Sequence, residues 1–398
     1  MQGLYIHIPF CESKCYYCGF YSTADRSSRK HYLQAVLNEA RERARKQERI
    51  QKPVSAQTPE QIDTLYIGGG TPSVFSAEEI AEFLKDLSGI YNLSHLKEAT
   101  LEVNPEHIAK SDDYLKILLE RTPVRRISMG VQSFDNDDLK FLGRRHNALI
   151  AIRAIEKILK ANIELSIDLI YGIPTSTNKI WKNNLQFLKH FGLNHFSAYS
   201  LTIEPNTVFA KKQIELNEDT TLQQYDILQQ WCAENGYEQY ETSNYARQEN
   251  YALHNCNYWN LSPYTGLGVS AHSYSGFNKD RTDTGNTVSA HSYQTQPCAT
   301  RRWNINNFEQ YISDPANSYQ QEHLTEADTF HEYIMTALRT KWGVQKQLLQ
   351  KFSPQLKAHF NKITAPLLQD KTIVETKQAY ILKSQSKLFA DMIAEKFF

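Results

Sequence analysis

Short apolar runs rich in β-branched and aromatic residues alternate, through the first half of the chain, with longer amphipathic segments. This alternation is typical of βα units, in which helices join parallel strands and cover the sheet. The pattern predicts six strands, at Leu4–Ile8, Ile62–Ile67, Ala99–Val103, Arg126–Gly130, Leu165–Ile170 and His195–Tyr199. It predicts helices at 30–50, 77–90, 111–121, 135–143, 147–161 and 178–191. Six such units indicate an α/β protein with a partial (β/α)6, TIM-like barrel.

The last part of the chain has a different pattern. Helical periodicity at 325–341, 344–352 and 354–368 is followed by a β-like run at Thr372–Leu382. This predicts a small C-terminal domain of winged-helix type, which we expect to act as a lid. Since 398 residues exceed what one core usually serves, we expect a core barrel at 1–235, a connecting segment at 236–319 and a C-terminal domain at 320–398.

Composition excludes several classes of function. The formal net charge is zero, so there is no basic footprint that would favour nucleic acid. No window approaches about 18 uninterrupted apolar residues, as a membrane-spanning helix would need. A strand is predicted almost at the N-terminus, with no basic or apolar leader before it, and we therefore expect a cytoplasmic location. Contact with a membrane surface and homodimer formation stay open.

Three of the six cysteines lie on one short loop after the first predicted strand. Cys11, Cys15 and Cys18 have the spacing C-x3-C-x2-C. Three thiolates so placed can hold three irons of a 4Fe-4S cluster and leave the fourth iron open to a ligand. Zinc is the alternative, but a closed zinc site needs four ligands, and no Cys or His follows within the next dozen residues. His7 on the preceding strand is a further candidate ligand, and a disulfide framework is disfavoured.

Glycine and polar motifs follow the other predicted strands. The run Gly68-Gly69-Gly70-Thr71-Pro72 follows the second, Glu102 lies at the end of the third, and Gln132 follows the fourth, with Arg144 beyond it. Asp168 lies near the end of the fifth. Ligands bind where the carboxyl ends of parallel strands meet. Glycines let the backbone approach a ligand closely, although a tight turn is the ordinary alternative, as helix capping is for Glu102.

The order and spacing of these segments resemble the radical S-adenosylmethionine (SAM) proteins, and among them the oxygen-independent coproporphyrinogen III oxidase family, from about residue 3 to the end. The resemblance implies that the three cysteines ligate a 4Fe-4S cluster, which passes an electron to SAM and so yields a 5′-deoxyadenosyl radical. The residues that it assigns to SAM are Tyr5, Gly69, Gly70, Thr71 and Glu102. Positions that also bind SAM in the family, including a second molecule in the oxidases, are Tyr17, Gln132, Arg144 and Asp168.

Two departures indicate which branch of the family this chain resembles. The oxidases have a fourth cysteine two residues after the third, where this chain has Phe20, and they have a longer segment before the cluster loop. Both features resemble the haem chaperone (HemW) branch, whose members bind haem and deliver it to acceptor proteins. In that branch the residue at Gly19 is usually Asp. The alternatives are oxidative decarboxylation of coproporphyrinogen III and another radical SAM activity, and whether SAM is cleaved productively stays open.

A second motif lies beyond the barrel. His254-Asn255-Cys256-Asn257-Tyr258-Trp259 matches the H-N-x-x-Y-W segment of the chaperone branch, and His254 is the candidate haem-iron ligand, with Cys256 as the alternative. A hydrogen-bonded structural histidine is the ordinary interpretation. The segment 266–271 imitates the G-x-G-x-x-A dinucleotide fingerprint, but no strand-turn-helix unit is predicted around it, so it does not indicate NAD binding.

Overall fold

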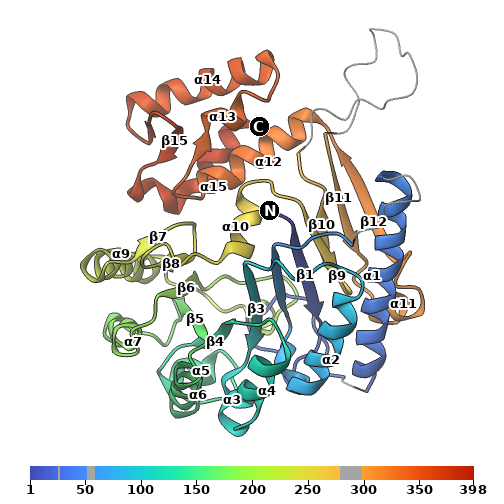
Figure 1. The fold of residues 1–398 in the computed structure, drawn as a ribbon. Helices are drawn as coiled ribbons and strands as arrows, with labels where there is room; N and C mark the ends of the chain where they lie inside the picture. The colour runs from blue at the N-terminus through green and yellow to red at the C-terminus, as the bar shows by residue number, and fades with distance from the viewer. Residues whose placement is uncertain (26, 52–58, 278–297) are drawn as a thin grey trace.

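A computed structural model describes residues 1–25, 27–51, 59–277 and 298–398 of the protein (Figure 1). Six parallel strands lie side by side in chain order, and this confirms the predicted partial (β/α)6 barrel. They are β1 (Gly3–Ile8), β2 (Thr64–Gly69), β3 (Glu98–Val103), β4 (Arg126–Gln132), β5 (Glu164–Tyr171) and β6 (His195–Ser200). Most of their side chains are buried, as expected for parallel strands that are covered on both faces.

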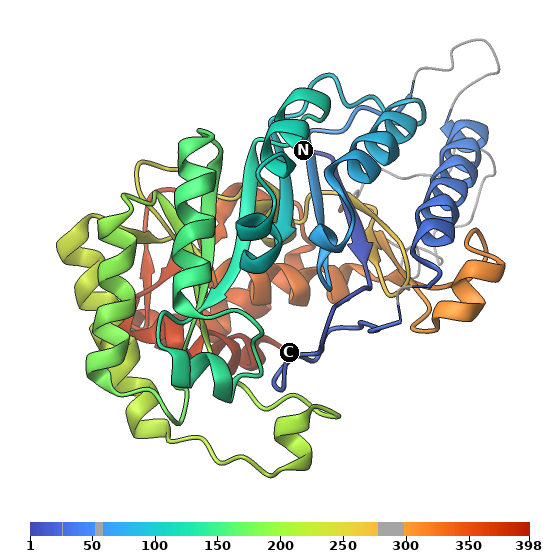
Figure 2. The same cartoon turned by 90° about the horizontal axis from the view of Figure 1, so that it is seen from below.

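Helices cover the outside of the curved sheet and form an arc around it when the molecule is seen from below (Figure 2). They are α1 (Arg29–Gln51), α2 (Ala77–Ser88), α3 (Pro105–Lys110), α4 (Tyr114–Arg121), α5 (Asn136–Phe141), α6 (Ala148–Lys160) and α7 (Asn178–His190). The local sequence determines where several of these helices begin. Ser76 and Glu79 form a reciprocal capping box at α2, and the Thr177 hydroxyl accepts a backbone N–H at the start of α7.

The sheet continues beyond the barrel on both sides, which the sequence pattern did not predict. Its full order is β12-β11-β10-β9-β1-β2-β3-β4-β5-β6-β8-β7. The added strands are β7 (Glu238–Gln239), β8 (Asn244–Ala246), β9 (Tyr264–Leu267), β10 (His272–Tyr274), β11 (Ala299–Asn304) and β12 (Tyr319–Leu324). The added helices are α8 (Val208–Lys211), α9 (Glu218–Asn235), α10 (Leu253–Trp259) and α11 (Phe308–Ser313). Only β9 among the added strands runs parallel to its barrel neighbour, β1.

The glycines of segment 266–271 form a tight connection between β9 and β10. Gly268 has φ +103°, and a Cβ there would lie 2.4 Å from the Tyr32 hydroxyl oxygen. The segment leads from one strand to another and opens no helix. The structure therefore confirms that this motif is not a dinucleotide fingerprint.

The C-terminal part has its own hydrophobic core, which includes Phe330, Phe352 and Phe360. Its elements are α12 (Glu326–Leu338), β13 (Val344–Gln345), α13 (Lys346–Leu349), α14 (Pro354–Gln369), β14 (Ile373–Glu375), β15 (Ala379–Leu382) and α15 (Ala390–Ala394). The three strands form a small antiparallel sheet in the order β13-β15-β14. This arrangement of helices and a small sheet agrees with the predicted winged-helix-like unit.

The unit does not lie over the cysteine loop, and the expectation that it acts as a lid stays a prediction. The Lys341 N–H donates to the Tyr240 carbonyl at 2.9 Å, and Lys387 Nζ donates to the Gln239 carbonyl at 3.0 Å. The Tyr240 hydroxyl in turn contacts His195, the first residue of β6. The unit thus packs at the amino ends of the strands, above the sheet in Figure 1, whereas the cysteine loop follows their carboxyl ends. Its core also takes in Leu261, so the predicted domain boundaries stay predictions.

No helix in the described ranges has the length and apolar character needed to cross a bilayer.

Candidate metal and ligand sites

The cysteine loop begins three residues after β1 and is tied to the barrel by backbone hydrogen bonds. The Cys11 N–H donates to the Thr23 carbonyl at 3.0 Å, and the Tyr16 N–H donates to the Leu142 carbonyl at 3.1 Å. The Cys11, Cys15 and Cys18 thiols are free and partly exposed. Burial raises the pKa of Cys11 and of Cys18, so a metal partner would be needed to hold them as thiolates.

The separation of the three sulfurs distinguishes two kinds of metal site. They do not all lie within 4.8 Å of one another. Thiolates that share one tetrahedral zinc at roughly 2.3 Å would lie about 4 Å apart. The three sulfurs are therefore too far apart in this structure to share a single zinc ion.

A chain of polar contacts joins Cys11 to Cys15 across the carboxyl ends of three strands. Thr71 Oγ1 donates to Cys11 Sγ at 3.6 Å, and Asn104 Nδ2 donates to Thr71 Oγ1 at 3.3 Å. Arg144 donates from Nη2 to Asn104 Oδ1 at 3.0 Å and from Nη1 to Cys15 Sγ at 3.1 Å. The Arg144 Nε is buried and has no hydrogen-bond partner. The Arg144 guanidinium thus places a positive charge and an unused N–H donor beside the thiols. Both features suit an anionic cluster and a ligand that carries a carboxylate.

The glycine run after β2 leaves no room for side chains. A Cβ on Gly70 would lie 2.7 Å from the Phe10 carbonyl oxygen and 3.1 Å from Cys11 Sγ. Gly69 has φ +114°, a conformation that favours glycine, and a Cβ there would lie 2.6 Å from the His7 ring. The backbone of this turn therefore passes directly beside the cysteine loop, where its polar groups can face a ligand.

Two carboxylates line the same end of the barrel. Burial raises the pKa of Glu102 to about 7 and that of Asp168 to about 6. Glu102 Oε2 accepts the Gly69 N–H at 2.9 Å. Neither carboxylate forms an ion pair with another side chain in the described part of the chain. Because a buried charge is costly without a partner, the pair is suited to a ligand that carries an ammonium or a sulfonium group.

The remaining residues assigned by the resemblance lie around this mouth or just below it. Gln132 is 8% exposed and has φ +71° beside an irregularity in the pairing of β4 with β5, which redirects its side chain. Tyr17 lies close enough to Arg144 for the guanidinium to affect its pKa, although burial is the larger influence and raises that pKa. Tyr5 lies in the middle of β1, and its hydroxyl contacts His7 Nδ1 at 3.0 Å.

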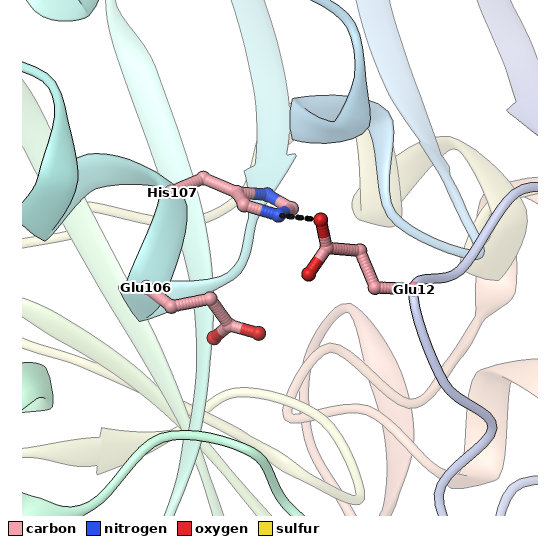
Figure 3. Close-up of side chains that lie close together, drawn as sticks. All are labelled: Glu12, Glu106 and His107. Atoms are coloured by element: carbon pink, nitrogen blue, oxygen red, sulfur yellow. Dashed lines mark ion pairs between the residues drawn. The ribbon is translucent and has the colours of Figure 1, made fainter.

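A further cluster of titratable side chains lies beside the cysteine loop, where Glu106 and His107 of α3 face Glu12 (Figure 3). His107 Nε2 lies 3.6 Å from Glu12 Oε1, and Arg145 forms an ion pair with the same carboxylate. Burial by itself raises the pKa of Glu106, but the His146 ring, a backbone N–H and the Arg144 charge together bring that pKa down to about 2. Since Arg145 offsets the charge of Glu12 and the two histidine rings lie beside the carboxylates, this group ties the loop to α3, and we do not assign a metal to it.

The structure places the candidate haem ligand away from the cysteines. His254 of α10 is 1% exposed and lies at the amino ends of the strands, next to Thr64, the first residue of β2. Its Nδ1 contacts Thr64 Oγ1 at 3.0 Å, and its Nε2 contacts the Tyr258 hydroxyl at 3.0 Å. Burial lowers the pKa of His254 to about 3, so the ring is neutral, as a metal ligand must be. Cys256 is also buried, which raises its pKa to about 12.

Three residues with a part in these sites were not predicted. Asn104 bridges Thr71 to Arg144. Glu98 accepts the Leu253 and His254 N–H groups at 2.8 and 2.9 Å and so caps α10. Tyr66 stacks on the His254 ring, with a centroid distance of 5.3 Å, and donates from its hydroxyl to Glu102 Oε1 at 2.8 Å. Asn104 comes two residues after the predicted Glu102 in the chain, but no local signal marks Glu98 or Tyr66.

Comparison with known proteins gives a consistent result. Residues 5–188 match the model of the Radical SAM superfamily. The chain is 35% identical over 274 residues to the Heme chaperone HemW of Buchnera aphidicola from Schizaphis graminum, covering 68% of this chain and 69% of the relative. It is 30% identical to the Heme chaperone HemW of Lactococcus lactis, covering 100% of this chain and 97% of the relative.

Among solved structures, the fold is similar to that of coproporphyrinogen III oxidase (HemN) from Escherichia coli. The TM-score is 0.78, and the match covers 100% of this chain and 89% of the other. The sequence identity is 21%, so this likeness supports the fold alone.

Proposed function

The chain belongs to the Heme chaperone HemW family of radical SAM proteins, and we propose that it binds haem and transfers it to an acceptor protein. The observation that carries the proposal is the likeness to named heme chaperones over the whole chain. Phe20 also supports it, because this side chain is 69% exposed at the position where the oxidases that the chain resembles have a fourth cysteine.

In this proposal His254 is the residue that binds the haem iron. Its neutral ring is ready to ligate, and Thr64 at Nδ1 would orient it in the way that a second hydrogen bond orients most metal-bound histidines. Nε2 is engaged by the Tyr258 hydroxyl, so ligation requires that this contact be given up. The arrangement is thus that of a closed state, with α10 held on Glu98.

The cysteine loop and the carboxylates serve the cofactors of the radical SAM family. A 4Fe-4S cluster held there would supply an electron for reductive cleavage of SAM. Arg144 would place its positive charge beside Cys15, and Glu102 and Asp168 would pair with the positive groups of SAM. The two cofactors would thus lie at one end of the barrel, whereas His254 lies near the other end.

An anaerobic experiment can separate the chaperone from the oxidase. The cluster-loaded protein is titrated with haemin, the Soret band is recorded, and the haem-loaded protein is then mixed with a haem-free globin as a test acceptor. We expect one haem per chain, haem transfer to the globin and an altered Soret band in His254→Ala. Cys256→Ser, which alters the neighbouring alternative ligand, should keep the wild-type spectrum.

The same preparation is incubated with coproporphyrinogen III, SAM and a reductant. We expect no decarboxylated porphyrin. Protoporphyrinogen IX formed over many turnovers would contradict the chaperone proposal and establish the oxidase.

A further inference from the structure

Tyr66 touches both candidate sites, and we infer that it couples them, so that SAM bound beside Glu102 weakens the binding of haem at His254. This coupling rests on the haem role proposed for His254. Tyr66 is the third residue of β2, between the Thr64 that contacts His254 and the glycine run that approaches the cysteine loop.

The contacts of Tyr66 are different at its two ends. Its ring stacks on the His254 ring with an interplanar angle of 28° and a centroid distance of 5.3 Å. Its hydroxyl donates to Glu102 Oε1 at 2.8 Å, while Glu102 Oε2 accepts the Gly69 N–H. One rigid side chain thus joins the imidazole to the carboxylate that the resemblance assigns to SAM.

At the haem end, the contact that must open is the His254–Tyr258 pair. In the structure the Tyr258 hydroxyl engages Nε2, and the ring is enclosed, with Tyr66 stacked on it and Tyr258 packed edge-on. Iron can ligate Nε2 only after this pair separates. Anything that fixes Tyr66 in place stabilises the enclosed arrangement and opposes ligation.

At the SAM end, the charge on Glu102 determines how firmly Tyr66 is held. Hydrogen bonds to an ionised carboxylate are shorter and roughly twice as strong as neutral ones. The positive charge that the sulfonium of SAM brings near Glu102 favours the ionised carboxylate and so strengthens its bond from the Tyr66 hydroxyl. SAM therefore favours the closed state of His254. By linkage haem must weaken SAM binding by the same factor.

Haem titrations of the cluster-loaded full chain, with and without saturating SAM, test the coupling. In the wild type, SAM is expected to raise the haem dissociation constant by roughly fivefold or more, the lower end of ordinary coupling. Tyr66→Phe keeps the ring and removes the hydroxyl contact, so the ratio should fall toward one. Tyr237→Phe is the matched control, because it removes a buried hydroxyl bonded to the Leu193 carbonyl and should keep the wild-type ratio.

A ratio of one in the wild type, or an unchanged ratio in Tyr66→Phe, would overturn the coupling. Amide hydrogen exchange gives a second measurement that needs no haem. SAM is expected to slow exchange at Leu253 and His254, whose N–H groups bond to Glu98, in the wild type and not in Tyr66→Phe. Should the wild type bind no haem at all, the proposed function fails, while exchange at α10 that is insensitive to SAM would separately reject the coupling.

Discussion

The affinity for SAM should depend on pH through Glu102. Burial raises the pKa of this carboxyl from 4.5 to about 7 in the protein without ligand, while the positive charge of SAM favours the ionised form. Raising the pH through this range should therefore strengthen SAM binding. The sign is opposite for the stability of the ligand-free protein. Since the folded state binds this proton more tightly than the unfolded state does, the stabilisation is present below about pH 4.5 and is lost as the pH rises through about 7.

The magnitude follows from the fraction of Glu102 that is ionised. With a pKa of about 7, roughly one Glu102 in ten is ionised at about pH 6 and roughly three in four at about pH 7.5. SAM affinity should thus rise about eightfold over this interval, or ~1 kcal/mol. Asp168, with a pKa of about 6, can add up to about a further factor of two at the lower end.

Equilibrium dialysis with labelled SAM on the anaerobic, cluster-loaded protein measures this dependence. Glu102→Gln should bind SAM more weakly and show a nearly flat pH profile, because the amide does not titrate. Asp168→Asn is the control, since it removes the neighbouring carboxylate and should keep most of the rise. A wild-type affinity that does not change with pH, or a full rise in Glu102→Gln, would refute the reasoning.

Three further predictions concern the loop and α10. Anaerobically reconstituted protein should carry about four irons per chain and lose them in Cys15→Ala, whereas stoichiometric zinc without iron would contradict the cluster. Glu98→Gln should lower the free energy of unfolding by about 2 kcal/mol in denaturant titrations. The two oxygens of Glu98 each accept one N–H group, whereas glutamine has a single, uncharged oxygen. The control Glu322→Gln breaks a half-exposed ion pair and should cost less than about 1 kcal/mol. Tyr258→Phe should raise haem affinity without moving the Soret band, because it frees Nε2 of His254, and weaker binding would instead indicate that the phenol contacts haem.

The central strands were predictable because they are covered on both faces and so appear as continuous apolar runs. The outer strands were not. β7 has two residues and β8 three, and such short segments become strands only by pairing with β6 or with each other. Their positions depend on contacts between distant parts of the chain, which a local pattern does not contain.

The same distinction applies to the site. The cysteine spacing and the glycine run are local, and both were found from the sequence. His254 was identified by residue type and motif, but its closed state depends on Thr64, which lies 190 residues away in the chain. Tyr66 and Glu98 are ordinary strand residues by sequence, and their roles arise only from what the fold brings beside them.

Among the residues that the structure describes, the sheet of this protein ends in two outermost strands rather than closing on itself, and each is poorly suited to pairing with another molecule. One outermost strand, β7, is only Glu238–Gln239. The other, β12, has exposed Gln320, Gln321 and His323 along its length. Long, flat, apolar edges recruit further strands and lead to aggregation, whereas short or polar ones resist it. We therefore expect neither edge to recruit a further strand, and valine at Gln321 and His323 is expected to remove that protection while leaving both hydrophobic cores intact.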